Sequence, residues 1–163
     1  MIETERRFLV KTLPPDIKVD KAEHIMQGYI TPMKDKTQVR LRKIFHHQYF
    51  LTIKTKAGHE MQRIETEVSL TQSQFNDLWP TVDERFILKV RCYIRYDDHI
   101  LIIDKFDGHL NGLITMEVEF PSLEKALAFT PPDWMGREIT NDKLYGNRRL
   151  AEFGLPEELK IKN

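Results

Sequence analysis

The sequence predicts a mainly β protein of the α+β class: an eight-stranded antiparallel closed β-barrel with a few helices packed around it. Eight segments alternate in polarity or are rich in β-forming residues, and short polar turns separate several of them. Only three segments carry helical signals. A closed barrel is expected because closure removes the exposed edges that an open antiparallel sheet would leave.

The predicted strands follow one another closely along the chain. They cover residues 2–10, 24–31, 37–45, 48–56, 61–69, 85–96, 99–106 and 114–120. Four connections are interpreted as hairpin turns from their residue types: 32–36, 46–47, 57–59 and 97–98.

Three helices are predicted from capping and helix-ending residues. They are expected to run from Thr71 to before Pro80, from Ser122 to before Pro131, and from Thr140 or Asn141 to Gly154. Apolar side chains such as Phe75 and Trp79 need a surface on which to pack. Residues 1–155 are expected to form a single domain, and residues 156–163 a frayed C-terminal tail.

The composition favours a globular protein of the cytoplasm. Of the 163 residues, 40% are hydrophobic and 31% are charged, which argues against disorder. The 25 basic and 25 acidic side chains cancel, so bulk charge favours neither nucleic acid nor an anionic membrane as a partner. No apolar run is long enough to span a membrane, the charged N-terminus is unlike a signal peptide, and the single Cys92 has no thiol partner.

The predicted strands carry charged side chains of one sign in pairs two residues apart. The pairs are Glu3/Glu5, Arg40/Arg42, Glu65/Glu67, Lys89/Arg91 and Glu117/Glu119. Residues two apart share one face of a strand, and apolar residues such as Leu41 and Val118 occupy the other face. Because the helices must cover the apolar faces, we expect the charged faces to point into the barrel as a polar tunnel.

Any one such pair is usually only the solvated face of a half-buried sheet. Three acidic and two basic pairs together indicate more, since like charges side by side repel unless counter-ions bind. A metal–polyphosphate needs both sets: carboxylate oxygens suit Mg²⁺ or Mn²⁺, and Arg and Lys bind phosphate oxygens. Positioning and charge neutralisation by such groups can provide most of the catalysis of phosphoryl transfer.

Other familiar sites find no support in the sequence. It has no P-loop GxxxxGK[ST], no GxGxxG after a strand and no HExxH, and its six His residues show no metal-ligand spacing. A Ser-His-Asp triad stays open, although no GxSxG elbow supports it. Tyr29, Trp79 and Trp134 fit packing positions as well as site positions.

The ordered motifs resemble the CYTH superfamily, the triphosphate tunnel metalloenzymes, and in particular its short bacterial members. The similarity spans about residues 2–151 and rests on the number and order of weak motifs. Glu3-x-Glu5-x-Arg7 is similar to the ExExK signature, and it is followed by Gln27-Gly28-Tyr29, Arg40-x-Arg42, Thr52-x-Lys54, Glu65-x-Glu67, Lys89-x-Arg91, Asp104, Glu117-x-Glu119 and Lys143-x-Tyr145-x-Asn147.

The resemblance implies a triphosphate tunnel that a C-terminal helix plugs at one end, with Lys143 or Arg148 reaching a phosphate. It implies Mg²⁺ or Mn²⁺ as cofactor, with ligands from the acidic set Glu3, Glu5, Glu65, Glu67, Asp104, Glu117 and Glu119. It implies triphosphate binding by the cations Arg7, Arg40, Arg42, Lys54, Lys89, Arg91 and Lys143, and catalytic roles for Lys89, Arg7 and Tyr29. Metal-activated water would attack a terminal phosphorus. The family also suggests a homodimer.

The signature lysine is replaced by Arg7 in this chain. Arginine keeps the positive charge but does not deprotonate in proteins, so a phosphate-anchoring role fits this position and a general-base role does not. Tyr29, which would face this position in the family, could then pair differently with the guanidinium.

The expected activity is hydrolysis of a linear triphosphate, foremost inorganic tripolyphosphate, because the short chain shows no extra element for a base. A class IV-type adenylate cyclase and a thiamine triphosphatase are alternatives within the family. A non-catalytic module that binds polyphosphate or nucleotide is an alternative of another class. The complete set of acidic pairs favours catalysis, since a pure anion binder has little use for carboxylates.

Overall fold

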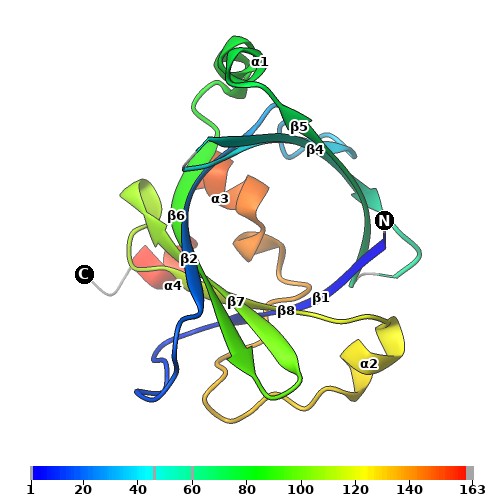
Figure 1. The fold of residues 1–163 in the computed structure, drawn as a ribbon, viewed down its shortest axis with the longest axis vertical. Helices are drawn as coiled ribbons and strands as arrows, with labels where there is room; N and C mark the ends of the chain where they lie inside the picture. The colour runs from blue at the N-terminus through cyan, green and yellow to red at the C-terminus, as the bar shows by residue number, and fades with distance from the viewer. Residues whose placement is uncertain (1, 46, 60, 161–163) are drawn as a thin grey trace.

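The fold is a closed β-barrel, seen in a computed structural model that describes residues 2–45, 47–59 and 61–160. Its antiparallel strands follow the order β1-β5-β4-β3-β2-β6-β7-β8 around the barrel (Figure 1). The strands are β1 (Ile2–Leu9), β2 (Lys21–Tyr29), β3 (Gln38–Ile44), β4 (Gln48–Lys56), β5 (Gln62–Leu70), β6 (Phe86–Tyr96), β7 (His99–Asp107) and β8 (Ile114–Glu119). Each begins and ends within three residues of its predicted position, so the predicted fold class is confirmed.

Two tight connections contain residues with positive φ at the predicted turns. Tyr96 of β6 pairs with His99 of β7, which leaves a two-residue turn in which Asp97 has a φ of 49°. Hairpin turns of this kind require a positive φ, and Asp tolerates it better than most residues. Between β3 and β4, His47 has a φ of 79°, and its neighbour His46 lies outside the described residues.

The first two predicted helices are confirmed with their N-caps. They are α1 (Gln72–Leu78) and α2 (Leu123–Ala128), capped by Thr71 and Ser122. Thr71 also forms a capping box with Gln74, because each residue's backbone N–H donates to the other's side chain. Two short 3-10 helices, η1 (Trp79–Val82) and η2 (Gly108–Leu110), complete the connections that flank β6 and β7.

The third predicted helix is wrong at its start. The chain instead forms the 3-10 helix η3 (Lys143–Tyr145) and then α3 (Asn147–Phe153). Gly146 stands between them with an extended ψ of 132°, which interrupts the helical hydrogen-bond pattern. The predicted end at Gly154 is confirmed, and its φ of 74° suits a glycine.

The segment that was expected to fray is helical in its first part. Residues Glu157–Lys160 form α4, and residues 161–163 lie outside the described part of the chain. The Glu158 carboxylate accepts hydrogen bonds from the hydroxyl of Tyr145 and, at 2.7 Å, from the guanidinium of Arg137. Contacts of this kind, which join distant parts of the chain, tie α4 to the segment before α3.

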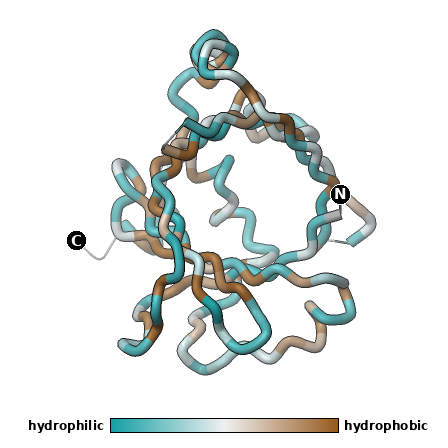
Figure 2. The backbone as a smooth tube through the Cα atoms, viewed as in Figure 1, coloured by the Kyte–Doolittle hydropathy of each residue, from teal (hydrophilic) through white to brown (hydrophobic). Residues whose placement is uncertain are grey.

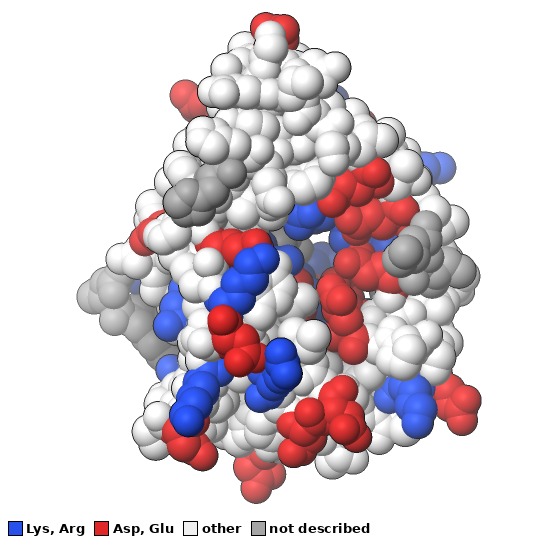
Figure 3. All heavy atoms as spheres, in the orientation of Figure 1, with Lys and Arg blue, Asp and Glu red and all other residues white. Residues whose placement is uncertain are grey.

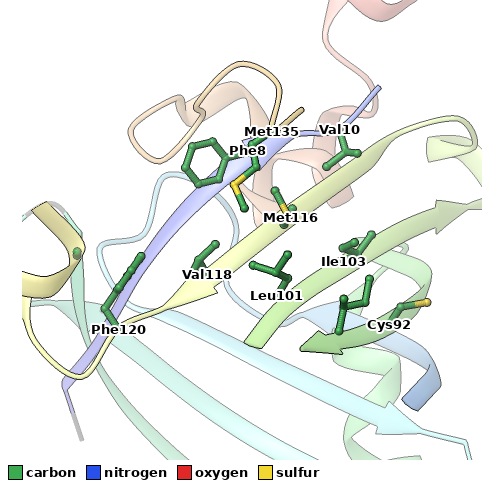
Figure 4. Packing of buried hydrophobic residues seen from close by; sticks show 11 residues of the cluster. Phe8, Val10, Cys92, Leu101, Ile103, Met116, Val118, Phe120 and Met135 are labelled. Atoms are coloured by element: carbon green, nitrogen blue, oxygen red, sulfur yellow. The ribbon is translucent and has the colours of Figure 1, made fainter. Parts of the chain in front are cut away.

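Apolar side chains on the outside of the barrel form two clusters beneath helices. Met116, Val118, Leu101 and Ile103 lie side by side on β7 and β8 (Figure 4), and Ala126 of α2 belongs to the same cluster. A second cluster joins the outer faces of β3 and β4 to α1 and η1, through Leu41, Tyr49, Phe75 and Val82. The alternation predicted from sequence therefore turns the apolar strand faces outward, toward the helices.

A third apolar cluster fills the inside of the barrel at the end that carries α3. It contains the following buried residues: Tyr29, Ile87, Phe106, Leu110, Leu113, Ile139, Tyr145, Leu150 and Ala151. In Figure 1, α3 is seen through the ring of strands, and Figure 2 shows that this segment is largely hydrophilic. The C-terminal segment thus lies across one end of the barrel, in the position expected of a plug. Among the described residues, no helix is long and apolar enough to cross a membrane.

Gly28 allows β2 to pack closely against η1, and this contact yields a test of the fold. A Cβ atom at position 28 would lie 2.6 Å from Val82 Cγ1 and 2.9 Å from Trp79 Cη2. We expect Gly28→Ala to lower the free energy of unfolding by about 1–3 kcal/mol in urea denaturation, because the added methyl group would overpack this contact. Gly58→Ala is the control, since a Cβ there meets nothing within 4 Å. Equal stability of the two variants would contradict this account of β2 packing.

Candidate active site

A large charged cavity of about 1030 Å³ occupies the interior of the barrel. Most of the predicted site residues line it: Glu3, Glu5, Arg7, Tyr29, Arg40, Arg42, Lys54, Glu65, Arg91, Glu117, Glu119 and Lys143. Of the other three predicted residues, Glu67 hydrogen-bonds to the lining residue Arg42 and Asp104 to the lining residue Arg91, while the buried Lys89 hydrogen-bonds to Asp104. Figure 3 shows acidic side chains gathered around the hollow at the near end of the barrel, with basic side chains deeper inside.

Charges of opposite sign face one another across neighbouring strands. Arg7 is paired in register with Glu117, Lys54 with Glu65, and Arg91 with Asp104. The single-sign pairs along each strand therefore find much of their compensation on the next strand. This corrects the expectation that the pairs would repel unless counter-ions bind, because strand register could not be read from the sequence.

Asp104 is the centre of the most buried ionic network. Its Oδ2 accepts hydrogen bonds from Lys89 Nζ at 2.6 Å and Arg91 Nη2 at 2.8 Å, and its Oδ1 accepts one from Arg91 Nε at 2.8 Å. Burial alone would raise the pKa of Asp104, but the two cations hold it well below its usual range. Burial, aided by the charge of Arg91, lowers the pKa of Lys89 to about 8. With both carboxylate oxygens occupied, Asp104 is better placed to position Lys89 and Arg91 than to bind metal.

Arg7 connects the cavity to the C-terminal segment. Its Nε lies 3.2 Å from Glu117 Oε1, and its Nη1 donates to the carbonyl oxygen of Tyr145 at 3.2 Å. Its backbone N–H donates to Thr140 Oγ1 at 3.0 Å. The planar guanidinium can make both side-chain contacts, to Glu117 and to Tyr145, at the same time, whereas a lysine ammonium is a compact point charge. The arginine at this position thus links the acidic wall to the plug.

Among the described residues, four arginines keep buried donors that make no hydrogen bond: Arg7 at Nη2, and Arg40, Arg42 and Arg148 at Nε. All four side chains line the same cavity. Buried donors normally have partners, and unpaired donors on cations are most readily satisfied by an anion with several acceptor oxygens.

Glu5 and Glu119 form the exception to the cross-strand pairing. They oppose each other in register on β1 and β8, and among the described residues neither carboxylate has an ion pair or hydrogen bond. Burial and the charge of Glu117 raise the pKa of both. Burial also raises the pKa of Glu3 to about 7, although Lys54 Nζ lies 2.6 Å from its Oε2. Uncompensated carboxylates in such a place fit a hard divalent cation.

The remaining acidic residues are engaged with cations. Glu65 contacts Lys54 and lies 3.3 Å from Arg40 Nη2, and Glu67 accepts hydrogen bonds from Arg42 at 2.9 Å and Thr52 at 2.7 Å. These contacts favour a role in orienting the cations. In the part of the chain that the structure describes, no group of three or more His, Cys, Asp or Glu side chains is assembled as a metal site.

Tyr29 and the plug residues meet at the end of the cavity nearest α3. Tyr29 is fully buried, and its hydroxyl accepts a hydrogen bond from Gln27. Burial raises the pKa of Tyr29, so the phenol is neutral near pH 7. Lys143 and Arg148 both line the cavity, and the Arg148 guanidinium donates to the carbonyl oxygens of Asp35 and Thr37. Arg148 therefore anchors α3 to the β2–β3 connection.

Three lining lysines were missed from the sequence. Lys34, Lys36 and Lys56 are exposed residues at the edge of the cavity, near the ends of β2, β3 and β4. Lys34 and Lys36 lie in a predicted turn and Lys56 ends a predicted strand, and lysines at such positions are also typical of solvated surface. Only the three-dimensional arrangement shows that they border the same cavity as the predicted cations.

Comparisons with known proteins agree with the fold and the cavity. The CYTH domain model matches residues 1–119. An inorganic triphosphatase of Nitrosomonas europaea is 41% identical over 152 residues, which cover 93% of this chain and 97% of the relative. An inorganic triphosphatase of Acetivibrio thermocellus is 32% identical over 154 residues, covering 92% and 93%. A crystal structure of an inorganic triphosphatase superposes with a TM-score of 0.67 at 39% identity, covering 91% and 93%.

The structure defines a β-barrel protein with a charged interior cavity, and the matches show that the chain belongs to the CYTH domain family. The predicted resemblance is thereby confirmed. The C-terminal motif with Lys143 lies beyond the residues that the family model matches.

Asp104→Asn tests the positioning role of the buried network. The substitution keeps the shape but leaves Lys89 with no carboxylate partner, so we expect the free energy of unfolding to fall by about 3–5 kcal/mol. Any metal-dependent activity should also fall and should not recover when the metal concentration is raised. Asp107→Asn, at an exposed position of the same strand, is the control and should change stability by less than about 0.5 kcal/mol. Recovery at high metal concentration would identify Asp104 as a metal ligand instead.

Glu5→Gln tests the uncompensated carboxylates through the pH dependence of stability. A carboxyl group whose pKa is raised on folding favours the folded state below its unfolded pKa, and this contribution is lost as the pH rises through its folded pKa. Because the pKa of Glu5 is raised, the metal-free variant should gain stability relative to the parent protein as the pH rises from about 4.5. Urea denaturation of both proteins at pH 5 and pH 8 measures this, with exposed Glu124→Gln as the control. A stability difference that is constant with pH would contradict the assignment.

Proposed function

We propose that this protein hydrolyses inorganic tripolyphosphate inside the barrel, with Mg²⁺ or Mn²⁺ as its metal. The observation that carries the proposal is the set of unpartnered buried donors on Arg7, Arg40 and Arg42 in one cavity with the unpaired Glu5 and Glu119. The donors fit a polyanion, and the carboxylates fit a divalent cation. The relatives named inorganic triphosphatase, at 41% and 32% identity, support the same activity.

The cations are proposed to bind and orient the phosphates. Arg40 and Arg42 project from β3 and Lys54 from β4, while Arg91 faces them from β6. Arg7 contributes its free Nη2, and Lys143 is placed near the plug. Interactions among partly buried groups in a confined cavity are stronger than the same contacts on the surface. A linear triphosphate held in this way has its charge neutralised before the reaction begins.

The acidic residues divide into two groups in this proposal. Glu3, Glu5, Glu117 and Glu119, on the adjacent strands β1 and β8, would hold the metal. A bound Mg²⁺ or Mn²⁺ supplies charge neutralisation for phosphate oxygens and lowers the pKa of water. Glu65, Glu67 and Asp104 would hold the cations in their working positions. Lys89, buried behind the lining, is assigned to the same supporting role rather than to contact with substrate.

Among the residues that the structure describes, no feature favours the alternatives within the family. A purine or thiamine ring calls for an aromatic platform, yet Trp79 and Trp134 both pack in the outer clusters. The aromatic side chains of the cavity lining are Tyr29 and Tyr93, and the Tyr93 hydroxyl donates to Glu23 at 2.9 Å. Cytoplasmic location remains a prediction from the sequence, and a homodimer remains a prediction from the family resemblance.

Phosphate release from tripolyphosphate, with ATP alongside, tests the proposal. The purified protein should release phosphate rapidly from tripolyphosphate with Mg²⁺ or Mn²⁺, slowly from ATP, and not at all with a chelator. Glu119→Gln should lower kcat about 100-fold or more while the circular dichroism spectrum stays unchanged, because the substitution keeps the size of the side chain at the end of β8. Glu124→Gln should behave as the parent protein.

Two outcomes would overturn the proposal. Tight metal-dependent binding of tripolyphosphate without phosphate release would identify a non-catalytic binding module. Formation of cyclic AMP and pyrophosphate from ATP would identify a cyclase.

A further inference from the structure

The chain enters the plug through a short segment, residues 137–140, that lies alongside the second half of β1. On this part of β1, β8 pairs with one edge, while β5 pairs with the first residues of the strand. The backbone N–H of Leu9 donates to the carbonyl oxygen of Arg137 at 2.9 Å, and the N–H of Ile139 donates to that of Arg7 at 2.8 Å. The segment therefore continues the wall of the barrel beside β1, where β5 does not pair.

This segment leads directly into the part of the plug that borders the cavity. Thr140, Asp142 and Lys143 all line the cavity. The segment also lies very close to β1, since a Cβ atom at Gly136 would collide with the carbonyl oxygen of Leu9. The way in which the segment is held against β1 thus decides where Lys143 is placed.

Glu138 holds the segment from the outside of the barrel. Its carboxylate accepts two hydrogen bonds from Arg6, one from Nε at 2.9 Å and one from Nη2 at 2.6 Å. Two-fold contacts between a guanidinium and a carboxylate are strong and directional. Arg6 is itself fixed, because its Nη1 donates to the carbonyl oxygens of Ala126 and Phe129 at 3.2 and 2.6 Å. The hydrogen bonds from Arg6 and Thr140 lower the pKa of Glu138, so the carboxylate is ionised near pH 7.

The hydroxyl of Thr140 connects this outer contact to the cavity. A hydroxyl has one hydrogen, and Thr140 Oγ1 donates it to Glu138 Oε1 at 2.7 Å. Its lone pairs are then directed away from Glu138, and Oγ1 accepts a hydrogen bond from the backbone N–H of Arg7 at 3.0 Å. The side chain of Arg7 in turn donates to the carbonyl oxygen of Tyr145 in the plug. We call the contacts of Glu138 with Thr140 and of Thr140 with Arg7 the Glu138–Thr140 linkage.

We propose that Glu138 is a positioning residue for binding of the triphosphate. By orienting the Thr140 hydroxyl, it holds the start of the plug against β1 and keeps Lys143 and Arg7 in position at the cavity wall. The inference rests on the proposed tripolyphosphate hydrolysis, in which these two cations bind phosphates. Glu138 is not one of the residues that line the cavity, so it acts through Thr140 and not by contact with the substrate.

The effect of Glu138 should fall on substrate binding more than on the chemical step. Glu5 and Glu119, which are assigned to the metal, are held by the register of β1 and β8 and not by the plug. Loss of contacts that are equally strong in the ground state and the transition state raises KM and leaves kcat unchanged. A merely structural ion pair between Arg6 and Glu138 would affect the free energy of unfolding and leave KM unchanged in the folded protein.

The test compares Glu138→Ala with two substitutions of Thr140. Glu138→Ala and Thr140→Val each break the linkage, and each should raise KM for tripolyphosphate about tenfold while kcat changes by less than about twofold. Thr140→Ser keeps the hydroxyl and should behave as the parent protein. The double variant Glu138→Ala/Thr140→Val should also raise KM about tenfold and not about 100-fold, because both substitutions remove the same linkage.

The matched control is Asp20→Ala. It removes an exposed carboxylate that binds Arg95 and lies outside the cavity lining, and it should leave KM unchanged. The metal concentration that gives half the maximal rate should be the same in all variants, because none of them alters a residue assigned to the metal. Circular dichroism and urea denaturation show whether each variant is folded under the assay conditions. If Glu138→Ala does not fold, a raised KM in Thr140→Val but not in Thr140→Ser supports the linkage, and equal KM values in the two overturn it.

The other outcomes separate this inference from the proposed function. An unchanged KM in folded Glu138→Ala, or a product of the two single effects in the double variant, overturns the inference and leaves the proposed function standing. If the parent protein binds tripolyphosphate without hydrolysing it, the proposed function fails, and the same comparison of variants is made on the Kd for tripolyphosphate. A raised Kd in Glu138→Ala that Thr140→Val does not increase further then supports the linkage, and an unchanged Kd overturns it. If the parent protein neither hydrolyses nor binds tripolyphosphate, both fail.

Discussion

The barrel encloses ionised side chains in a confined space, and each of these charges needs a partner close by. Arg7, Lys54 and Arg91 obtain theirs from carboxylates directly opposite on the next strand. Buried ion pairs of this kind contribute little net stability, because desolvation offsets their attraction. The apolar clusters outside the barrel and under the plug must therefore supply most of the stabilisation. The groups left without a partner are therefore the ones that a bound ligand can compensate.

The carboxylates without an ion pair and the arginine donors without a hydrogen bond share one cavity. Glu5 and Glu119 face each other without a cation, and Arg7, Arg40 and Arg42 keep buried donors unused. Each set is costly in the free protein, and a metal-bound polyanion would relieve both costs at once. The site is thus the part of the interior where the cross-strand compensation is incomplete. Asp104, by contrast, is fully compensated and serves to fix Lys89 and Arg91.

The strands and the inward charges could be predicted because they depend on short-range alternation, which fixes the face of residues such as Leu41 and Val118. The caps at Thr71 and Ser122 were predictable for the same local reason. Cross-strand register is not local, so the pairing of Lys54 with Glu65 could not be read from the sequence. Likewise, α4 lies in the predicted tail and contacts the rest of the chain through Glu158, which meets Tyr145 only in the folded protein. Lys34 and Lys36 lie in the β2–β3 connection, where lysines usually mean only solvent exposure.

The central claim is that a triphosphate and its metal lie inside the barrel, between the arginines of β3 and the carboxylates of β1 and β8. The most direct measurement is a crystal structure with Mn²⁺ and imidotriphosphate, an analogue whose bridging nitrogen resists hydrolysis. Anomalous scattering should place manganese beside Glu5 and Glu119, with phosphate oxygens within hydrogen-bond distance of Arg40 and Arg42. Manganese away from these carboxylates, or an analogue bound only outside the barrel, would contradict the account.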